Sequence, residues 1–196
     1  GQARFGDDLL RNLEALRAAG AGEIRGYRAP CFSLTAETGW AYERLAQLGF
    51  TYSSSVLPAR SPLYGNPAFG TEPRLIEGLV ELPVTLLPFR LLPVPVGGLY
   101  FRVVPRPILR RALAERRSRG EAVASYHHPY DIDTEQSFTH AGFRRWSAFD
   151  LLMRANRGSV LPRLEMAASL GFSFAAYGPH AERVGESLRS ERGAYD

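Results

Sequence analysis

Apolar positions along the chain recur at two different periods, and these periods predict helices and strands in alternation. Leu9, Leu13 and Leu16 have the three-to-four-residue spacing of a helix face. Other stretches repeat that spacing and stop at a glycine, so we expect helices at 7–20, 35–49, 107–119 and 159–170. Short apolar runs lie between these segments and predict strands at 23–27, 50–53, 79–86, 122–126 and 172–176.

Strands that alternate with helices of this length indicate βαβ units, a parallel sheet and therefore an α/β fold. In such sheets the residues that follow the carboxyl ends of the strands lie on one face, where α/β enzymes keep their chemistry. Arg28 directly follows the run 23–27, and His128 follows the run 122–126. We therefore expect this arginine and this histidine to contribute to one shared site.

Two connections are unusually long, residues 54–78 and 87–104, and both are rich in proline and glycine. Long connections inside a domain are typical of lids and binding loops. Their aromatic residues could stack on sugar rings, although loop aromatics more often anchor a loop to the core. The candidates are Tyr64, Phe69, Tyr100 and Phe101.

The composition fits one domain, because 196 residues, of which 45% are hydrophobic, can bury a single substantial core. No lysine occurs, which excludes a Schiff-base lysine and a phosphate loop ending in Gly-Lys. The single cysteine, Cys31, excludes an internal disulfide bond. No apolar run approaches the roughly twenty residues that a membrane span needs, so we expect no membrane span.

The net charge of +4 at pH 7 is a mild excess, and its densest run of arginines lies on the predicted helix 107–119. Clustered positive charge can attract polyanions. A charged helix face without interleaved aromatic residues is more often simply solvated. We therefore expect no nucleic-acid partner.

Several motifs together resemble one enzyme family. The run Gly26-Tyr27-Arg28-Ala29-Pro30-Cys31-Phe32-Ser33 resembles the third motif of the polysaccharide deacetylases, carbohydrate esterases with a chitooligosaccharide-deacetylase homology domain, and His128-Pro129 resembles their last motif. The ordered set is most similar to the bacterial subfamily associated with exopolysaccharide synthesis. It comprises Tyr52-Ser53-Ser54-Ser55, Gly97-Gly98-Leu99-Tyr100-Phe101-Arg102 and His128-Pro129-Tyr130-Asp131-Ile132-Asp133.

This resemblance implies a distorted (β/α) barrel of seven strands, here a partial barrel whose first repeats are missing. Residues 1–180 are then the carboxyl-terminal part of a polysaccharide deacetylase domain, and residues 181–196 are a polar tail. The family's upstream Thr-Phe-Asp-Asp and His-x-x-x-His motifs, which hold its metal, do not occur in this sequence. We expect a divalent metal, zinc by resemblance, in the full-length protein, no metal bound by this chain alone, and no activity of this chain alone.

The implied reaction is the hydrolytic removal of N-acetyl groups from a bacterial polysaccharide or oligosaccharide, the work of a hydrolase on carbon–nitrogen bonds other than peptide bonds. The resemblance assigns His128 as the acid that protonates the leaving amine, and Arg28 as the cation that keeps a catalytic aspartate ionised. That aspartate is not in this chain. The residues expected to bind the substrate are Tyr27, Pro30, Tyr64, Tyr100 and Phe101.

The surroundings of His128 leave alternatives open. A carboxylate of Asp131 or Asp133 could orient the imidazole, but both could equally form a surface turn. His127 points to the other side of an extended backbone, so we interpret it as a packing residue. Ser53 stands where relatives have an aspartate, which puts the activity of even an intact domain in question.

A second hypothesis is a catalytically silent carbohydrate-binding or scaffold domain that keeps the face of the barrel without its chemistry. Under either hypothesis the expected partner is an acetylated glycan. The sequence leaves open the sugar, the oligomeric state, and whether the protein lies in the bacterial cytoplasm or at the cell envelope.

Overall fold

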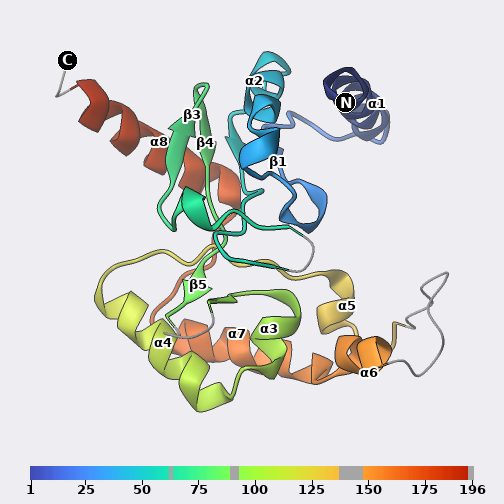
Figure 1. The fold of residues 1–196 in the computed structure, drawn as a ribbon. Helices are drawn as coiled ribbons and strands as arrows, with labels where there is room; N and C mark the ends of the chain where they lie inside the picture. Colours follow the sequence, from blue (N-terminus) through green and yellow to red (C-terminus); the bar gives the residue numbers. More distant parts are fainter. Residues whose placement is uncertain (62–63, 89–92, 137–147, 194–196) are drawn as a thin grey trace. The chain divides into compact units, whose positions relative to one another are not determined.

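The computed structural model describes residues 1–61, 64–88, 93–136 and 148–193 (Figure 1). It contains two units. Gly1–Pro83 and Ala175–Asp196 form the first, and Val84–Phe174 form the second.

The first unit is built on a sheet whose strands follow one another in the order β1-β2-β4-β3. Three strands are parallel, namely β1 (Gly26–Tyr27), β2 (Tyr52–Ser53) and β4 (Leu79–Glu81), and β3 (Arg74–Ile76) pairs antiparallel with β4. The predicted parallel pairing of the first three strands is therefore confirmed. The predicted strand 79–86 is shorter than expected, because Pro83 has no N–H to donate to a ladder.

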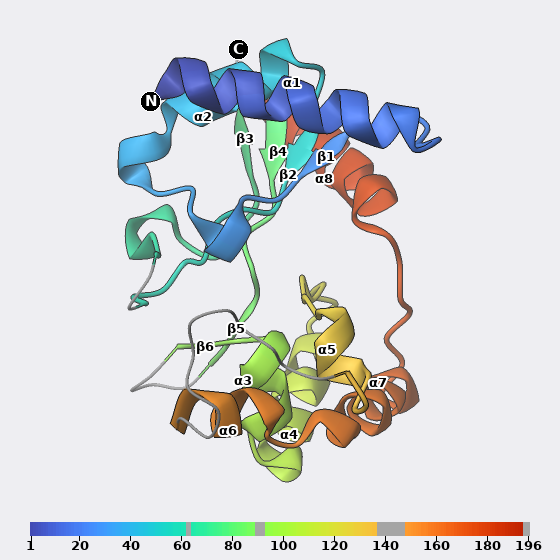
Figure 2. The ribbon, with the colours of Figure 1, turned by 90° about the vertical axis from the view of Figure 1, so that its right-hand side faces the viewer.

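Helices cover both faces of this sheet, as the two ribbon views show: α1 (Gln2–Ala18) and α2 (Trp40–Gln47) on one, and α8 (Tyr177–Gly193) on the other (Figures 1 and 2). Side chains alternate across a strand, and β4 follows this rule. Leu79 packs into the cluster of α1 and α2 side chains that includes Leu9, Leu13, Ala41 and Leu45. Val80 packs into the opposite cluster, which contains Leu82 and Ala181.

One strand predicted near the end of the chain is absent. Residues 172–176 form no strand, and Phe174 is 65% exposed, because no strand of the described part lies beside this segment to pair with it. Of the predicted polar tail, residues 181–193 belong to α8, and Ala181 is buried against the sheet. Apolar contact therefore orders a segment whose composition alone indicates a frayed end.

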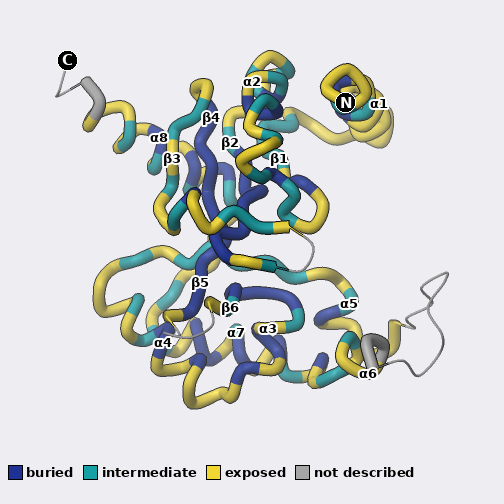
Figure 3. The backbone as a smooth tube through the Cα atoms, viewed as in Figure 1, coloured by how far each residue is buried: buried dark blue, intermediate teal, exposed yellow. Residues whose placement is uncertain are grey.

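The second unit is mainly helical around one apolar cluster, with a short hairpin of β5 (Leu86–Leu87) and β6 (Val94–Pro95). Buried residues of the hairpin and of three helices share this cluster, and Figure 3 shows buried segments along them. The described helices of this unit are α3 (Gly98–Val103), α4 (Arg106–Ser118), α5 (Pro129–Ile132), α6 (Ala148–Arg154) and α7 (Val160–Ser169), and α3, α4 and α7 are the three that contribute to the cluster.

The predicted helices 107–119 and 159–170 match α4 and α7 closely, whereas the predicted strand 122–126 is absent. That segment does run beside Thr85, which donates its backbone N–H to the carbonyl of Ala124 (3.0 Å). The return bond comes from the Ala124 N–H to the Thr85 hydroxyl (2.9 Å). The Thr85 hydroxyl thus takes the place of a backbone carbonyl as the acceptor, and no regular ladder forms between these two segments. The only strand-like pairing of residues 122–126 with the described residues is the isolated bridge between Gly97 and Tyr126.

The fold thus combines helices with sheets of mixed orientation, in agreement with the predicted α/β class. The strands of the described residues do not close into a barrel. Among the helices described, none has the length and apolar character required to cross a membrane.

Candidate functional site

Arg28 leaves the carboxyl end of β1 and is held there by uncharged groups. Its Nε donates to the carbonyl of Ser54 and its Nη2 to the Ser54 hydroxyl, both at 2.9 Å. The guanidinium lies over the ring of Tyr177, 4.9 Å from the centroid, and 5.4 Å from that of Phe32. Arg28 is exposed, and no carboxylate of the described residues forms an ion pair with it.

Glu81, the last residue of β4, holds the loop that carries Ser54 through hydrogen bonds to its backbone. Glu81 Oε1 accepts the backbone N–H groups of Ser55 (2.7 Å) and Val56 (3.0 Å). Ser55 in turn accepts the backbone N–H of Ala29 at 2.8 Å. A buried carboxylate therefore connects the ends of three parallel strands and sets the position of Arg28.

The environment of Glu81 makes its charge costly. The side chain is fully buried, and this burial raises its pKa, an effect only partly offset by hydrogen bonds from Ser53 and from the backbone of Ser55 and Val56. Sequence reasoning did not select Glu81. An ionisable residue inside the apolar run 79–82 is the signal that could have identified it.

The motif loop after Arg28 is strained. Cys31 and Phe32 both have left-handed backbone conformations, with φ of 56° and 55°. For residues with a side chain such conformations cost about 1–3 kcal/mol each and cluster at functional sites. Turn bonds from Phe32 N–H to Ala29 and from Ser33 N–H to Pro30 stabilise the loop.

His128 immediately precedes α5 in the second unit, and one of its two ring nitrogens contacts a carboxylate. Its Nδ1 lies 3.2 Å from Oδ2 of Asp131, and its backbone N–H donates to the same oxygen at 2.9 Å. The ring of Tyr130 stacks on the imidazole at 4.6 Å, and Tyr126 meets it edge-on at 6.0 Å. The side chain is 49% exposed, and no hydrogen bond from the described residues reaches its Nε2.

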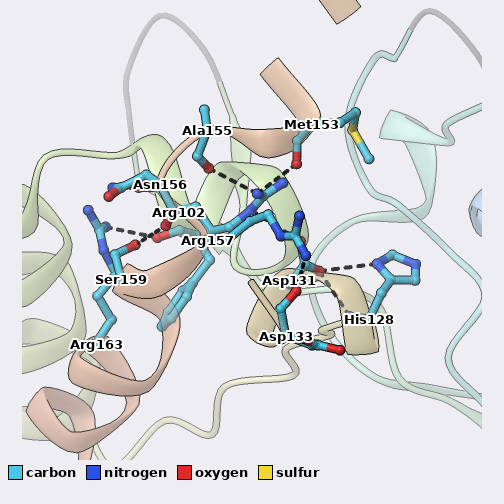
Figure 4. Close-up of polar contacts among 11 residues, drawn as sticks. Arg102, His128, Asp131, Asp133, Met153, Ala155, Asn156, Arg157, Ser159 and Arg163 are labelled. Atoms are coloured by element: carbon cyan, nitrogen blue, oxygen red, sulfur yellow. Dashed lines mark hydrogen bonds and ion pairs between the residues drawn. The ribbon is translucent and has the colours of Figure 1, made fainter. Parts of the chain in front are cut away.

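Asp131 is completely buried and lies between the guanidinium of Arg102 and the imidazole of His128 (Figure 4). Its Oδ1 is 3.1 Å from Nε of Arg102, whose side chain is also completely buried. Arg102 Nη1 donates to the carbonyls of Met153 and Ala155, both at 2.9 Å. Burial alone raises the pKa of Asp131, but the hydrogen bonds from His128 and the charge of Arg102 outweigh burial and lower it.

The two aspartates after His128 have different contacts. Asp131 orients His128, whereas Oδ1 of Asp133 accepts the backbone N–H groups of Glu135 and Gln136, which is a local turn. The Asp133 carbonyl accepts a hydrogen bond from Arg157. Asp133 thus ends α5 and does not contact the imidazole.

The two glycines at the start of the second-unit motif allow Tyr126 to approach closely. A Cβ on Gly97 would lie 2.4 Å from the ring of Tyr126 and 2.6 Å from its carbonyl oxygen. Gly98 has a positive φ of 47° and donates its N–H to that carbonyl at 2.8 Å. The Gly-Gly-x-Tyr-Phe-Arg motif therefore contacts the histidine turn at both ends, through Tyr126 and through Asp131.

Two neighbours of this turn are structural. The predicted packing role of His127 is confirmed, because the ring meets Phe101 edge-on at 4.9 Å and its Nε2 lies 3.0 Å from the Ser125 hydroxyl. Burial lowers the pKa of His127. Phe101, predicted to bind substrate, is 3% exposed in the apolar cluster. That prediction is wrong, because a buried ring has no face for a sugar.

The other predicted substrate residues differ in exposure. Tyr64 and Tyr100 are 46% and 40% exposed, and Pro30 is also exposed, so their substrate role stays a prediction. Phe69 is buried and belongs to the core. Tyr27 is half-buried and lines a cleft of about 310 Å³ whose walls also include Phe5, Asp8, Ser33 and Trp40.

Arg28 and His128 belong to different units, so the expected shared site stays a prediction. The described residues contain no group of three or more His, Cys, Asp and Glu side chains that could hold a metal ion. The donor set present therefore does not fit the metal that the resemblance implies. His140 lies outside the described residues.

Comparison with known proteins identifies a family for most of this region. A family model described as a domain of unknown function, DUF3473, covers residues 54–177, more than half of the chain. The matched range includes Glu81, Arg102, His128 and Asp131, whereas Arg28 precedes it. Neither the curated proteins nor the solved structures contain a significant match to the chain.

Proposed function

The chain belongs to the DUF3473 family, a domain of unknown function, and we propose that it supplies the proton-donating part of a polysaccharide deacetylase. In this reaction the amide bond of an N-acetylated sugar is hydrolysed, and acetate and an amine are released. The amine departs poorly unless a proton reaches its nitrogen. His128 is the residue that donates this proton.

The proposal rests on the orientation of the His128 imidazole, in which Nδ1 contacts a carboxylate and the ring is partly exposed. Its Nδ1 is directed to the buried carboxylate of Asp131, while the ring is about half exposed. A carboxylate on Nδ1 fixes the orientation of the ring and stabilises the charged imidazolium from which the proton is donated. The arrangement leaves Nε2 as the nitrogen that exchanges a proton with a substrate.

Arg28 serves a different step. A guanidinium is permanently charged and binds carboxylates through a planar fork. Ser54 and two aromatic rings position this fork without neutralising it. We assign Arg28 to holding a catalytic aspartate ionised, as the resemblance implies.

The parallel strands β1, β2 and β4, with Arg28 and the serine loop at their carboxyl ends, support a partial barrel of the deacetylase type. The motif order favours a bacterial exopolysaccharide as the acetylated glycan. Tyr27, Pro30, Tyr64 and Tyr100 are the candidates for sugar contact. Within this chain His128 donates the proton and Arg28 orients the carboxylate. The described residues include no cluster that could hold a metal, so no catalytic step is assigned to a metal here.

The test uses acetate release from N-acetylated oligosaccharides by the protein that contains this chain. His128→Gln is expected to lower kcat by about 10²–10⁴-fold, the usual contribution of a general acid. The adjacent His127→Gln is the matched control. It changes an imidazole of the same loop that packs on Phe101, and it should leave the rate per folded molecule nearly unchanged.

Equal rates for His128→Gln and the unchanged protein would refute the assigned acid. Saturable glycan binding without any acetate release, with zinc supplied, would replace the deacetylase by a carbohydrate-binding domain.

A further inference from the structure

We propose that Arg102 is a positioning residue for His128, acting through the buried carboxylate of Asp131. The catalytic meaning of this inference rests on the proposed function, whereas the orientation itself is a property of the second unit. It gives a role to the arginine that closes the Gly-Gly-x-Tyr-Phe-Arg motif.

Each carboxylate oxygen of Asp131 faces a different side chain. Oδ1 faces Nε of Arg102 at 3.1 Å, and Oδ2 faces Nδ1 of His128 at 3.2 Å while it accepts the His128 backbone N–H. Rotation of the carboxylate about its Cβ–Cγ bond would break contacts on both sides. Arg102 therefore holds the plane of the carboxylate that aligns the imidazole.

Arg102 is itself fixed from a distant part of the chain. Its Nη1 donates to the carbonyls of Met153 and Ala155, and its own carbonyl accepts the side-chain amide of Asn156 at 2.6 Å (Figure 4). A lysine could keep the charge, but its single ammonium cannot reach these carbonyls and Asp131 with the same fork geometry. The guanidinium therefore couples the end of α6 to the histidine turn.

Burial makes the charge of Asp131 depend on Arg102. A carboxylate without contact with water is strongly disfavoured unless a cation and hydrogen bonds compensate. Both side chains are completely buried, and among the described residues the only other side chain within ion-pair distance of Asp131 is the imidazole of His128. If Arg102 is replaced by an uncharged residue, the buried carboxylate of Asp131 tends to take up a proton. It can then no longer serve as an anionic acceptor for the Nδ1–H of His128.

Arg163 provides a matched control. It is also a buried arginine of the second unit, 5% exposed, and it also donates to two carbonyls, those of Phe101 (2.8 Å) and Val104 (2.6 Å). In contrast to Arg102, it forms no ion pair with a carboxylate of the described residues. Replacing Arg163 thus removes a buried cation from the same core without touching Asp131.

The experiment records ¹⁵N spectra of histidine-labelled chain at neutral pH, with the His128 signals assigned by their loss in His128→Gln. The unchanged chain is expected to show His128 as the Nδ1–H tautomer, because Asp131 accepts that proton. Arg102→Met and Arg102→Lys should each shift the tautomer ratio toward Nε2–H by about tenfold or more, as expected for loss of a hydrogen bond to a charged group. Arg163→Met should leave the ratio unchanged.

Three results would overturn the inference: an Nε2–H tautomer of His128 in the unchanged chain, an unchanged ratio in folded Arg102→Lys, or an equal shift in Arg163→Met. The first result needs no variant, so the inference stays testable if Arg102→Met does not fold. The spectra do not depend on turnover. If the protein that contains this chain releases no acetate while the Arg102 variants shift the His128 tautomer as expected, the deacetylase proposal is rejected and the role of Arg102 is retained.

Discussion

Replacing Asp131 by asparagine is expected to destabilise the second unit far more than the loss of an ordinary ion pair. The change keeps the shape of the side chain and removes its charge, so that the guanidinium of Arg102 stays buried without a counter-ion. At 3.1 Å and an effective dielectric constant of about 20, the attraction between the two charges is about 5 kcal/mol. Removing one partner of a buried pair typically costs about 3–5 kcal/mol.

The chain offers a matched exposed pair. Glu115 and Arg119 lie 2.9 Å apart on α4, nearly the same distance, but their side chains are 53% and 47% exposed. Water already solvates both charges there, so Glu115→Gln should cost about 0–1 kcal/mol. The comparison separates the effect of burial from the effect of distance.

Amide hydrogen exchange under native conditions is the suitable assay, because it reports local unfolding free energies and resolves the two units. The free energy of opening at amides of α3 and α4 should fall by about 3–5 kcal/mol in Asp131→Asn and by no more than about 1 kcal/mol in Glu115→Gln. Equal losses in the two variants would refute the argument that the buried charge needs its partner.

Three further outcomes are expected. Gly97→Ala should cost about 1–3 kcal/mol by overpacking against Tyr126, whereas Gly22→Ala, with nothing within 4 Å of the added Cβ, should be neutral in thermal unfolding. Burial raises the pKa of Glu81, so folding favours its protonated form. The free energy of unfolding should therefore fall as pH rises from about 4.5 through the folded pKa, and urea titrations of Glu81→Gln should show a flatter profile. Arg28→Lys should leave stability nearly unchanged at this exposed position, yet lower acetate release by about tenfold or more through loss of the fork; full activity would remove Arg28 from the site.

The sequence by itself determined the elements whose signals are local. Helical spacing ending at a glycine predicted α4 and α7, and apolar runs predicted β1, β2 and the start of β4. The same patterns placed Arg28 at a strand end, as observed, whereas the strand that they placed before His128 is absent. These features depend on neighbours within a few residues, which a sequence displays directly.

Only the tertiary structure decided how buried charges are paired. Arg102 meets Asp131 and then two carbonyls more than fifty positions away, and Glu81 meets a loop twenty-five positions earlier in the chain. Ordering of the last helix and loss of the strand at 122–126 likewise depend on which segments lie beside them. A residue's type gives its charge and size, but long-range packing decides whether it meets water or a partner.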